Sequence, residues 1–212
     1  MPVRILLADD HTLMRQGLRR ILEDHPEFEV VAEADSGIEA VKSARQHRPD
    51  VAIVDVAMNE LNGIEATLQI VRQSPRTAVL ILSMHADERY VLRAVRAGAR
   101  GYVLKNCAAD ELIDAVRSVH NGGSFFSPPV AKFFRNGSVR PEEDGDRFEL
   151  LTGRERQIYQ LLAEGNTNKD IAQRLNLSLH TVETHRWRIM EKLDLHNTAE
   201  LVLSAVRRGM VI

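Results

Sequence analysis

Five short apolar runs, each followed by a helical pattern, constrain the fold of this chain more than any other feature. The runs occupy residues 5–8, 30–32, 51–54, 78–82 and 102–104. After each run, apolar residues recur three or four positions apart, as on the buried face of a helix. Strands that are apolar throughout and alternate with helices are typical of a parallel sheet covered on both faces. We therefore predict a doubly wound α/β domain in the N-terminal part.

Polar side chains stand where four of these runs end. Asp9 and Asp10 follow the first run, Asp55 the third, Ser83 the fourth and Lys105 the fifth. In open α/β sheets, ligands bind at the carboxyl ends of the strands. Carboxylates gathered there repel one another, and a divalent cation that prefers oxygen ligands, such as Mg²⁺, relieves the repulsion. A carboxylate can also accept a phosphoryl group beside a cation and a hydroxyl donor, so we predict a phosphoacceptor site with a metal.

On these motifs, residues 4–120 resemble the receiver domain of two-component response regulators. Asp9-Asp10-His11 resembles the acidic pair of that family, and Asp55-Val56-Ala57-Met58 with Gly63 resembles its phosphoacceptor segment. Ser83 is similar to the switch serine or threonine, and Tyr102-Val103-Leu104-Lys105 is similar to the aromatic switch residue and its following lysine. The resemblance implies a flavodoxin-like, five-stranded parallel sheet with strand order 2-1-3-4-5.

The resemblance also implies which residues hold the phosphoryl group and the metal. Asp55 would accept the phosphoryl group from a sensor histidine kinase. Mg²⁺ would be held by Asp10, Asp55 and the Ala57 carbonyl, with Asp9 acting through water.

Three further residues would respond to the phosphoryl group by the same resemblance. Lys105 would pair with it and Ser83 would donate a hydrogen bond to it. Tyr102 would follow Ser83 inward and reshape the adjacent face of the domain.

Asn59 departs from the family pattern, in which proline usually follows the methionine of the phosphoacceptor segment. Proline would fix the backbone there. Its absence predicts a looser loop after Asp55 and altered rates of phosphorylation or dephosphorylation. The departure removes no chemical group from the site.

Residues 123–147 differ in composition and are predicted to form an interdomain linker. Residues 136–146 are rich in glycine, proline and acidic side chains, which favour irregular structure. Four phenylalanines lie in the first half, which predicts that this half packs against a domain or forms a short helix. The predicted domains are therefore a receiver at 1–122 and a second domain at 148–212.

From Leu150 onward the pattern is helical, and four helices are predicted. Thr152-Gly153-Arg154-Glu155 matches a capping box that starts the first helix, and Gly165 ends it. Thr167 opens the second, and residues 179–193 and 197–208 form the third and fourth. Residues 148–212 resemble the LuxR-type helix-turn-helix domain. Joined to a receiver, this segment is similar to the NarL/FixJ class of response regulators, which implies a small all-α, four-helix DNA-binding domain.

The third helix of this domain carries the predicted DNA contact. At about 100° per residue, the residues that share its buried face are Val182, Ile189 and Leu193. The resemblance implies that Glu183, Thr184 and Trp187 face base edges in the major groove. The predicted phosphate contacts are Thr167, Asn168, Lys169, Thr181, His185, Arg186, Arg188 and Lys192.

Several of these positions allow a second interpretation. Glu183 either stabilises the first turns of its helix through the helix dipole or accepts from a cytosine amino group. Trp187 either packs inside the domain or stands exposed, and its outward angle favours exposure. Arg188, with Glu191 or Lys192, either takes part in phosphate binding or is only solvated surface charge.

Residues 197–208 are apolar over more of the helix circumference than one buried stripe requires. We predict that part of this surface packs on the domain and that the rest makes a dimer contact. The protein is therefore expected to form a homodimer when it is phosphorylated or on DNA, matching half-sites about one helical turn apart.

Charge and composition narrow the remaining choices. The net charge is −2, and residues 148–212 hold nine Lys or Arg against eight Asp or Glu, so DNA binding must rest on local clustering. The single cysteine, Cys107, is better interpreted as an ordinary half-buried residue than as a catalytic thiol.

No apolar run approaches the ~20 residues of a membrane helix and no secretory signal is visible, which predicts a cytoplasmic protein without membrane contact.

The predicted function is that of a transcription regulator whose binding to double-stranded promoter DNA depends on phosphorylation at Asp55. RNA polymerase is an expected partner, and the protein is not expected to be an enzyme beyond slow self-dephosphorylation. One alternative is a degenerate receiver that regulates transcription without phosphorylation. Another is an aspartate-based phosphohydrolase, but enzymes similar to the haloacid dehalogenase group carry their nucleophile after the first strand, whereas Asp55 follows the third.

Overall fold

The computed structural model describes residues 1–135, 147–208 and 210–211. The chain divides into two compact units, residues 1–140 and 141–212. Each unit is described by itself below. Among the described residues, no helix combines the length and the apolar character needed to cross a membrane.

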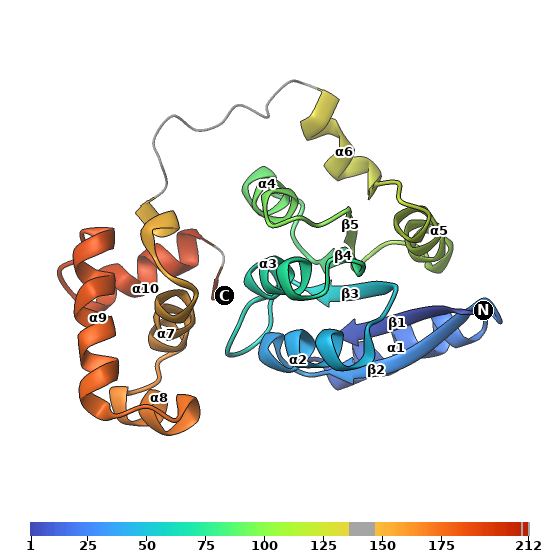
Figure 1. Cartoon of the computed structure of the whole chain (residues 1–212). Helices are drawn as coiled ribbons and strands as arrows, with labels where there is room; N and C mark the ends of the chain where they lie inside the picture. The colour runs from blue at the N-terminus through green and yellow to red at the C-terminus, as the bar shows by residue number, and fades with distance from the viewer. Residues whose placement is uncertain (136–146, 209, 212) are drawn as a thin grey trace. The chain divides into compact units, whose positions relative to one another are not determined.

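The N-terminal unit is built on one parallel sheet (Figure 1). Its strands are β1 (Val3–Ala8), β2 (Phe28–Ala34), β3 (Val51–Asp55), β4 (Ala78–Ser83), β5 (Gly101–Leu104) and β6 (Phe125–Phe126). Their order in the sheet is β2-β1-β3-β4-β5-β6, and every neighbouring pair is parallel. The predicted order of the first five strands is confirmed, and a sixth, two-residue strand is added at the β5 edge.

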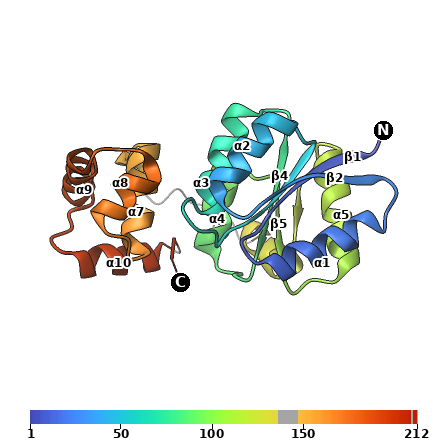
Figure 2. The ribbon, with the colours of Figure 1, turned by 90° about the horizontal axis from the view of Figure 1, so that it is seen from below.

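Helices cover both faces of this sheet, as Figure 2 shows. They are α1 (Thr12–Glu23), α2 (Gly37–His47), α3 (Gly63–Gln73), α4 (Glu88–Arg96) and α5 (Ala109–His120). Helices α2, α3 and α4 pack on one face, and α1 and α5 pack on the other. The doubly wound α/β architecture predicted from the apolar runs is therefore confirmed.

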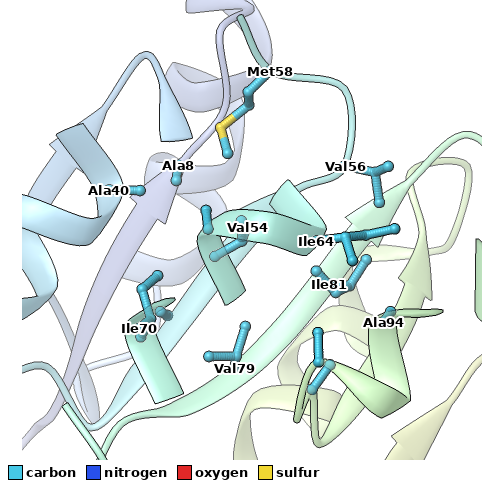
Figure 3. Close-up of a cluster of buried hydrophobic side chains, with 14 of the residues drawn as sticks. Ala8, Ala40, Val54, Val56, Met58, Ile64, Ile70, Val79, Ile81 and Ala94 are labelled. Carbon is cyan, nitrogen blue, oxygen red and sulfur yellow. The ribbon is translucent and has the colours of Figure 1, made fainter. Parts of the chain in front are cut away.

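The strands supply both cores because successive side chains point to opposite faces of a sheet. In β3, Val54 joins the core under α2, α3 and α4, while Ile53 joins the core under α1 and α5. Figure 3 shows the first of these cores, in which Val54 and Ile81 lie near Ile64 of α3. Burial on both faces explains why these strands are apolar throughout.

The first half of the predicted linker is folded onto the N-terminal unit. β6 pairs with β5, and helix α6 (Pro128–Arg135) follows it and lies against α4 (Figure 1). Val130 is fully buried in the core that contains α4, and Phe126 and Phe133 pack against the same core. The expected packing and short helix are both present. The second half of the predicted linker, residues 136–146, lies outside the described residues.

The C-terminal unit is helical, as predicted. A short 3₁₀ helix η1 (Arg147–Leu150) precedes α7 (Gly153–Ala163), α8 (Asn168–Leu175), α9 (Leu179–Leu193) and α10 (Thr198–Arg207). Thr152 and Thr167 both form capping boxes, with Glu155 and Asp170 three positions later. Gly165 has the positive φ of 86° that a left-handed residue after a helix end requires. Apolar residues from all four α-helices form one core.

Candidate functional site

The ends of β1, β3 and β5 bring two aspartates and one lysine together. In the register of the sheet, Ala8 pairs with Val54, so that the next residues, Asp9 and Asp55, lie side by side. Lys105, directly after β5, reaches back to both carboxylates: its Nζ lies 2.8 Å from Asp9 Oδ2 and 2.8 Å from Asp55 Oδ2. Asp9 and Asp55 are only 1% and 2% exposed. A shared lysine thus holds two buried carboxylates.

Burial dominates the electrostatics of Asp55. Loss of water raises the pKa of this carboxyl from 3.8 to about 6, and the nearby Asp9 adds to the rise, although Lys105 and the Ala57 N–H oppose it. Burial alone would lower the pKa of Lys105, but Asp55 and Asp9 together raise it above its ordinary value. Lys105 is therefore charged at neutral pH, and Asp55 is mostly ionised.

Asp10 lies beside this pair, with a polar side chain close to each of its two carboxylate oxygens. Asn59 Nδ2 donates to Asp10 Oδ2 over 3.2 Å, and His11 Nδ1 lies 2.7 Å from Asp10 Oδ1. Sequence reasoning missed both contacts. It treated Asn59 only as the loss of a proline, whereas the carboxamide adds a hydrogen bond that proline could not make. The predicted loosening of this loop stays a prediction.

The donor set of this corner fits a divalent cation. One ligand atom each from Asp9, Asp10, His11 and Asp55 lies within 4.8 Å of the others. Asp10 Oδ1 is buried and accepts no hydrogen bond from the described residues. Three carboxylates suit a hard cation that prefers oxygen ligands. Ala57, whose carbonyl was predicted as a further ligand, lies in the loop directly after β3, and its N–H donates to Asp55.

Gly63 allows the loop after β3 to close tightly over Asp55. A Cβ atom on residue 63 would lie 1.8 Å from the Asp55 backbone oxygen, closer than any real contact. Helix α3 begins at this glycine, capped by the side chain of Asn62. The glycine eight residues after Asp55 is thus needed for a close backbone approach.

The two switch residues meet at the end of β4. Ser83 is buried, and its Oγ accepts a 3.0 Å hydrogen bond from the His85 N–H. Tyr102 is fully buried and donates from its hydroxyl to the His85 carbonyl over 2.8 Å. The His85 ring also stacks on Tyr90 of α4, with centroids 4.8 Å apart. Tyr102 therefore already occupies an inward position in this structure.

Ser127, which the sequence did not single out, ties the segment after α5 to the same strand. Its N–H donates to the Tyr102 carbonyl over 3.0 Å. Its Oγ accepts from the Leu104 N–H over 3.2 Å and donates to Glu111 Oε1. Ser127 is buried. Its hydrogen bonds to the backbone of Tyr102 and Leu104 link the segment of β6 and α6 to β5, close to the switch tyrosine and Lys105.

In the C-terminal unit, α9 presents the face predicted for DNA. Val182, Ile189 and Leu193 are buried, as predicted from the helical period. Trp187 is 64% exposed, which settles its orientation in favour of the outward one. The other exposed or half-buried positions proposed for DNA on this helix are Thr181, Glu183, Thr184, His185, Arg186, Arg188 and Lys192.

Three of the predicted phosphate contacts, Asn168, Arg186 and Lys192, make contacts within the unit. Lys192 Nζ lies 2.7 Å from Glu155 Oε2, and Glu155 is buried. Arg186 donates to Asn168 Oδ1 over 3.3 Å and to Thr198 Oγ1 over 2.9 Å, joining α8, α9 and α10.

Among the remaining predicted phosphate contacts, Thr167 and Lys169 lie at the start of α8, Thr181 lies near the start of α9, and His185 and Arg188 lie further along α9. Thr167 caps α8 and donates to Asp170, and Thr181 is within 2.8 Å of the Ser178 hydroxyl. Lys169 is exposed. In the described part of the chain, His185 Nδ1 is buried without a hydrogen-bond partner.

Both units match known families. Residues 5–117 match the family described as response regulator receiver domain, and residues 149–205 match bacterial regulatory proteins, luxR family. The chain is 40% identical over 215 residues to oxygen regulatory protein NreC of Staphylococcus carnosus (strain TM300), covering 99% of each. It is 36% identical over 208 residues to response regulator UvrY of Escherichia coli (strain K12), covering 98% of this chain and 95% of that one.

Solved structures resemble the chain over nearly its whole length. One is the response regulator ChrA of a heme-sensing two-component system, with 32% identity, a TM-score of 0.54 and 99% of each chain covered. Another is the two-component response regulator RcsB in complex with DNA, with 25% identity, a TM-score of 0.61, and 97% of this chain and 100% of that one covered.

Proposed function

Because the chain belongs to the two-component response regulators that join a receiver domain to a LuxR-type DNA-binding domain, we propose that Asp55 is the residue whose phosphorylation switches it. The protein is a transcriptional regulator whose DNA binding depends on phosphorylation. The observation that carries the assignment of Asp55 is its position at the end of the central strand, with Lys105 Nζ 2.8 Å from its Oδ2.

The arrangement of charges supports nucleophilic attack by Asp55. An Asp55 oxygen forms a bond to the phosphorus atom carried by the kinase histidine, and the phosphorus–nitrogen bond breaks. Lys105 then pairs with the phosphoryl oxygens that replace the carboxylate charge, and the Ser83 hydroxyl donates to one of them. Attack requires ionised Asp55, and a pKa of about 6 leaves the carboxyl ionised at neutral pH.

Mg²⁺ is the cation that we assign to this site. Asp10, Asp55 and the Ala57 carbonyl would hold it, with Asp9 acting through water. The bound ion supplies positive charge that offsets the charge of the incoming phosphoryl group. The same site supports slow self-dephosphorylation, although the family does not consist of enzymes in the ordinary sense.

In the C-terminal unit, α9 is the helix that we place in the major groove of promoter DNA. Glu183, Thr184 and Trp187 would face the bases, and the cations and hydroxyls around them would contact phosphates. The exposure of Trp187 supports this assignment. RcsB, to which the chain is similar, has been solved as dimers bound to DNA, which supports a homodimer on DNA here.

The proposed domains are a receiver at 1–122, a linker at 123–147, and a DNA-binding domain at 148–212. The first part of the linker, β6 and α6, packs on the receiver. A sensor histidine kinase is the proposed donor and RNA polymerase a proposed partner at the promoter. The cytoplasm is the compartment in which kinase, DNA and polymerase meet this protein.

Phosphorylation of the full chain by a small-molecule phosphodonor with Mg²⁺ tests the assignment. Intact-protein mass spectrometry is expected to show one phosphoryl group on the wild type and none on Asp55→Asn. Asp114→Asn, at an exposed carboxylate of α5, is the matched control and should label like the wild type. Equal labelling of Asp55→Asn would refute the assignment.

A second measurement separates the switch from the degenerate alternative. The affinity of the labelled and unlabelled wild type for a cognate duplex is compared at fixed salt, since phosphate contacts make affinity salt-dependent. A higher affinity of the labelled protein is expected. Equal affinities would favour a receiver that acts without phosphorylation.

A further inference from the structure

We propose that His11 is a ligand of the divalent cation and that it makes this receiver bind Mn²⁺ in preference to Mg²⁺. The inference rests on the proposed metal site, to which it adds an imidazole nitrogen. It concerns the residue directly after the acidic pair, whose role neither the sequence nor the comparisons define.

The position of the His11 ring supports ligation. Its Nδ1 lies 2.7 Å from Asp10 Oδ1 and 3.3 Å from Asp9 Oδ1. At such distances a well-aligned ring N–H would donate a hydrogen bond, yet Asp10 Oδ1 accepts none from the described residues. The ring nitrogen and the carboxylate oxygen are therefore close together without pointing at each other.

These separations match neighbouring ligands of one octahedral ion. Ligand atoms about 2.1 Å from a metal and at right angles are about 3 Å apart. The two distances from His11 Nδ1 lie on either side of that value. Ligand atoms of Asp9, Asp10, His11 and Asp55 also all lie within 4.8 Å of one another, so one ion could be held by Asp10, His11 and Asp55, with Asp9 acting through water.

The other oxygens of the acidic residues are already engaged elsewhere. Lys105 contacts Asp9 Oδ2 and Asp55 Oδ2, and Asn59 donates to Asp10 Oδ2. Asp9 Oδ1 accepts a hydrogen bond from the His11 backbone N–H over 2.8 Å, and Asp10 Oδ1 lies 2.7 Å from the His11 ring nitrogen, so both Oδ1 atoms lie beside His11. The contacts of Lys105 and Asn59 thus orient the oxygens that share a corner with Nδ1.

His11 is also available for this role. It occupies the N-cap position of α1, but its side chain makes no capping hydrogen bond. The side chain is 68% exposed, so its ring can adjust without disturbing a packed core. A histidine that does not cap its helix and holds its Nδ1 close to two carboxylates can offer that nitrogen to an ion.

The chemistry of the mixed donor set selects the ion. Carboxylates and water suit Mg²⁺ and Mn²⁺ alike, but Mg²⁺ is the harder of the two ions and gains less than Mn²⁺ from a nitrogen ligand such as imidazole. An imidazole beside carboxylates therefore adds affinity for Mn²⁺ and little for Mg²⁺. The site remains usable by Mg²⁺ because the three carboxylates suffice for it.

Electron paramagnetic resonance of Mn²⁺ added to the full, unphosphorylated chain tests this proposal. The free ion gives a sharp signal that is lost on binding, which yields the Mn²⁺ affinity. Spin-echo modulation of the bound ion reports directly coordinated nitrogen. Mg²⁺ affinity comes from competition with Mn²⁺. The variants are His11→Gln, which replaces the imidazole by an amide, and His120→Gln, which alters an exposed histidine in the last turn of α5.

The wild type and His120→Gln are expected to show nitrogen modulation, and His11→Gln is expected to lose it. Mn²⁺ should bind His11→Gln about tenfold more weakly, and Mg²⁺ less than about threefold more weakly. Absence of nitrogen modulation in the wild type, or equal Mn²⁺ affinities of wild type and His11→Gln, would overturn the proposal while leaving the carboxylate site intact. Failure of the wild type to bind either ion would overturn the metal site itself, and this inference with it.

Discussion

Replacing Asp55 with Asn is expected to stabilise the metal-free receiver at neutral pH. The substitution keeps the shape of the side chain and removes a charge that is 2% exposed. In the folded protein the pKa of Asp55 is raised to about 6 from 3.8. Stability contributed by the protonated carboxyl is complete below about pH 4 and is lost as pH rises through about 6. Asn does not titrate, so the variant loses nothing over this window.

The size of the effect follows from the same rise in pKa. Each pKa unit corresponds to about 1.4 kcal/mol. Above pH 7, the free energy of unfolding of Asp55→Asn should therefore exceed that of the wild type by about 3 kcal/mol. At pH 5, where folded Asp55 is mostly protonated, the advantage should fall to about half. The attraction of Lys105 is already included, because it lowers the pKa of Asp55. Saturating Mg²⁺ should narrow the difference by neutralising the carboxylate in the wild type.

Chemical denaturation of the full chain with a chelator, followed at pH 5, 6, 7 and 8 by circular dichroism, measures this difference. The receiver transition is compared between wild type, Asp55→Asn and Asp114→Asn. Among the described residues, the exposed Asp114 forms an ion pair with Arg117 alone, so its loss should change stability by less than about 0.5 kcal/mol. If the wild type were as stable as Asp55→Asn at pH 8, the destabilisation of the Asp55 carboxylate by burial would not exceed its stabilisation by Lys105, and the reasoning would be refuted.

Three further substitutions test individual contacts. Asn59→Ala removes the donor to Asp10 Oδ2 and should weaken Mg²⁺ binding about threefold in calorimetry, as expected for one exposed hydrogen bond; unchanged affinity would mean that the contact does not orient Asp10. Ser127→Ala leaves the buried Leu104 N–H without its acceptor and should lower the receiver's free energy of unfolding by about 2 kcal/mol, and a loss below about 0.5 kcal/mol would contradict this. Trp187→Ala removes an exposed side chain, so DNA affinity in fluorescence anisotropy should fall at least about tenfold with an unchanged melting temperature, and full DNA affinity would exclude Trp187 from the interface.

The parts of the fold that the sequence predicted are those where one physical constraint decides the outcome. Apolar runs that alternate with helical patterns favour buried parallel strands, and the adjacency of Asp9 and Asp55 followed from chain order and strand pairing. The helix boundaries of the C-terminal unit followed from local capping, as at Thr152 and Thr167. Such signals lie within a few residues of the element that they specify.

The remainder depended on side-chain contacts between distant parts of the chain. Asn59 reaches Asp10 across 49 positions, and Lys192 pairs with Glu155 across 37. No local pattern encodes these partners, because each depends on how two separately formed elements pack. Strand β6 was not predicted for a related reason. Its two residues are too few to show a periodic pattern, and they form a strand by pairing with the edge strand β5.

The docking of β6 and α6 on β5 has a consequence for domain exchange. A chimera joined at residue 122 would discard Ser127 and Val130, exposing the edge of β5 and part of the core beneath α4. A junction placed after Arg135 would transfer the receiver together with the segment that rests on its switch strand. An output domain joined after Arg135 should be controlled by phosphorylation of the receiver. An output domain joined at residue 122 should be linked to the receiver without being controlled by it.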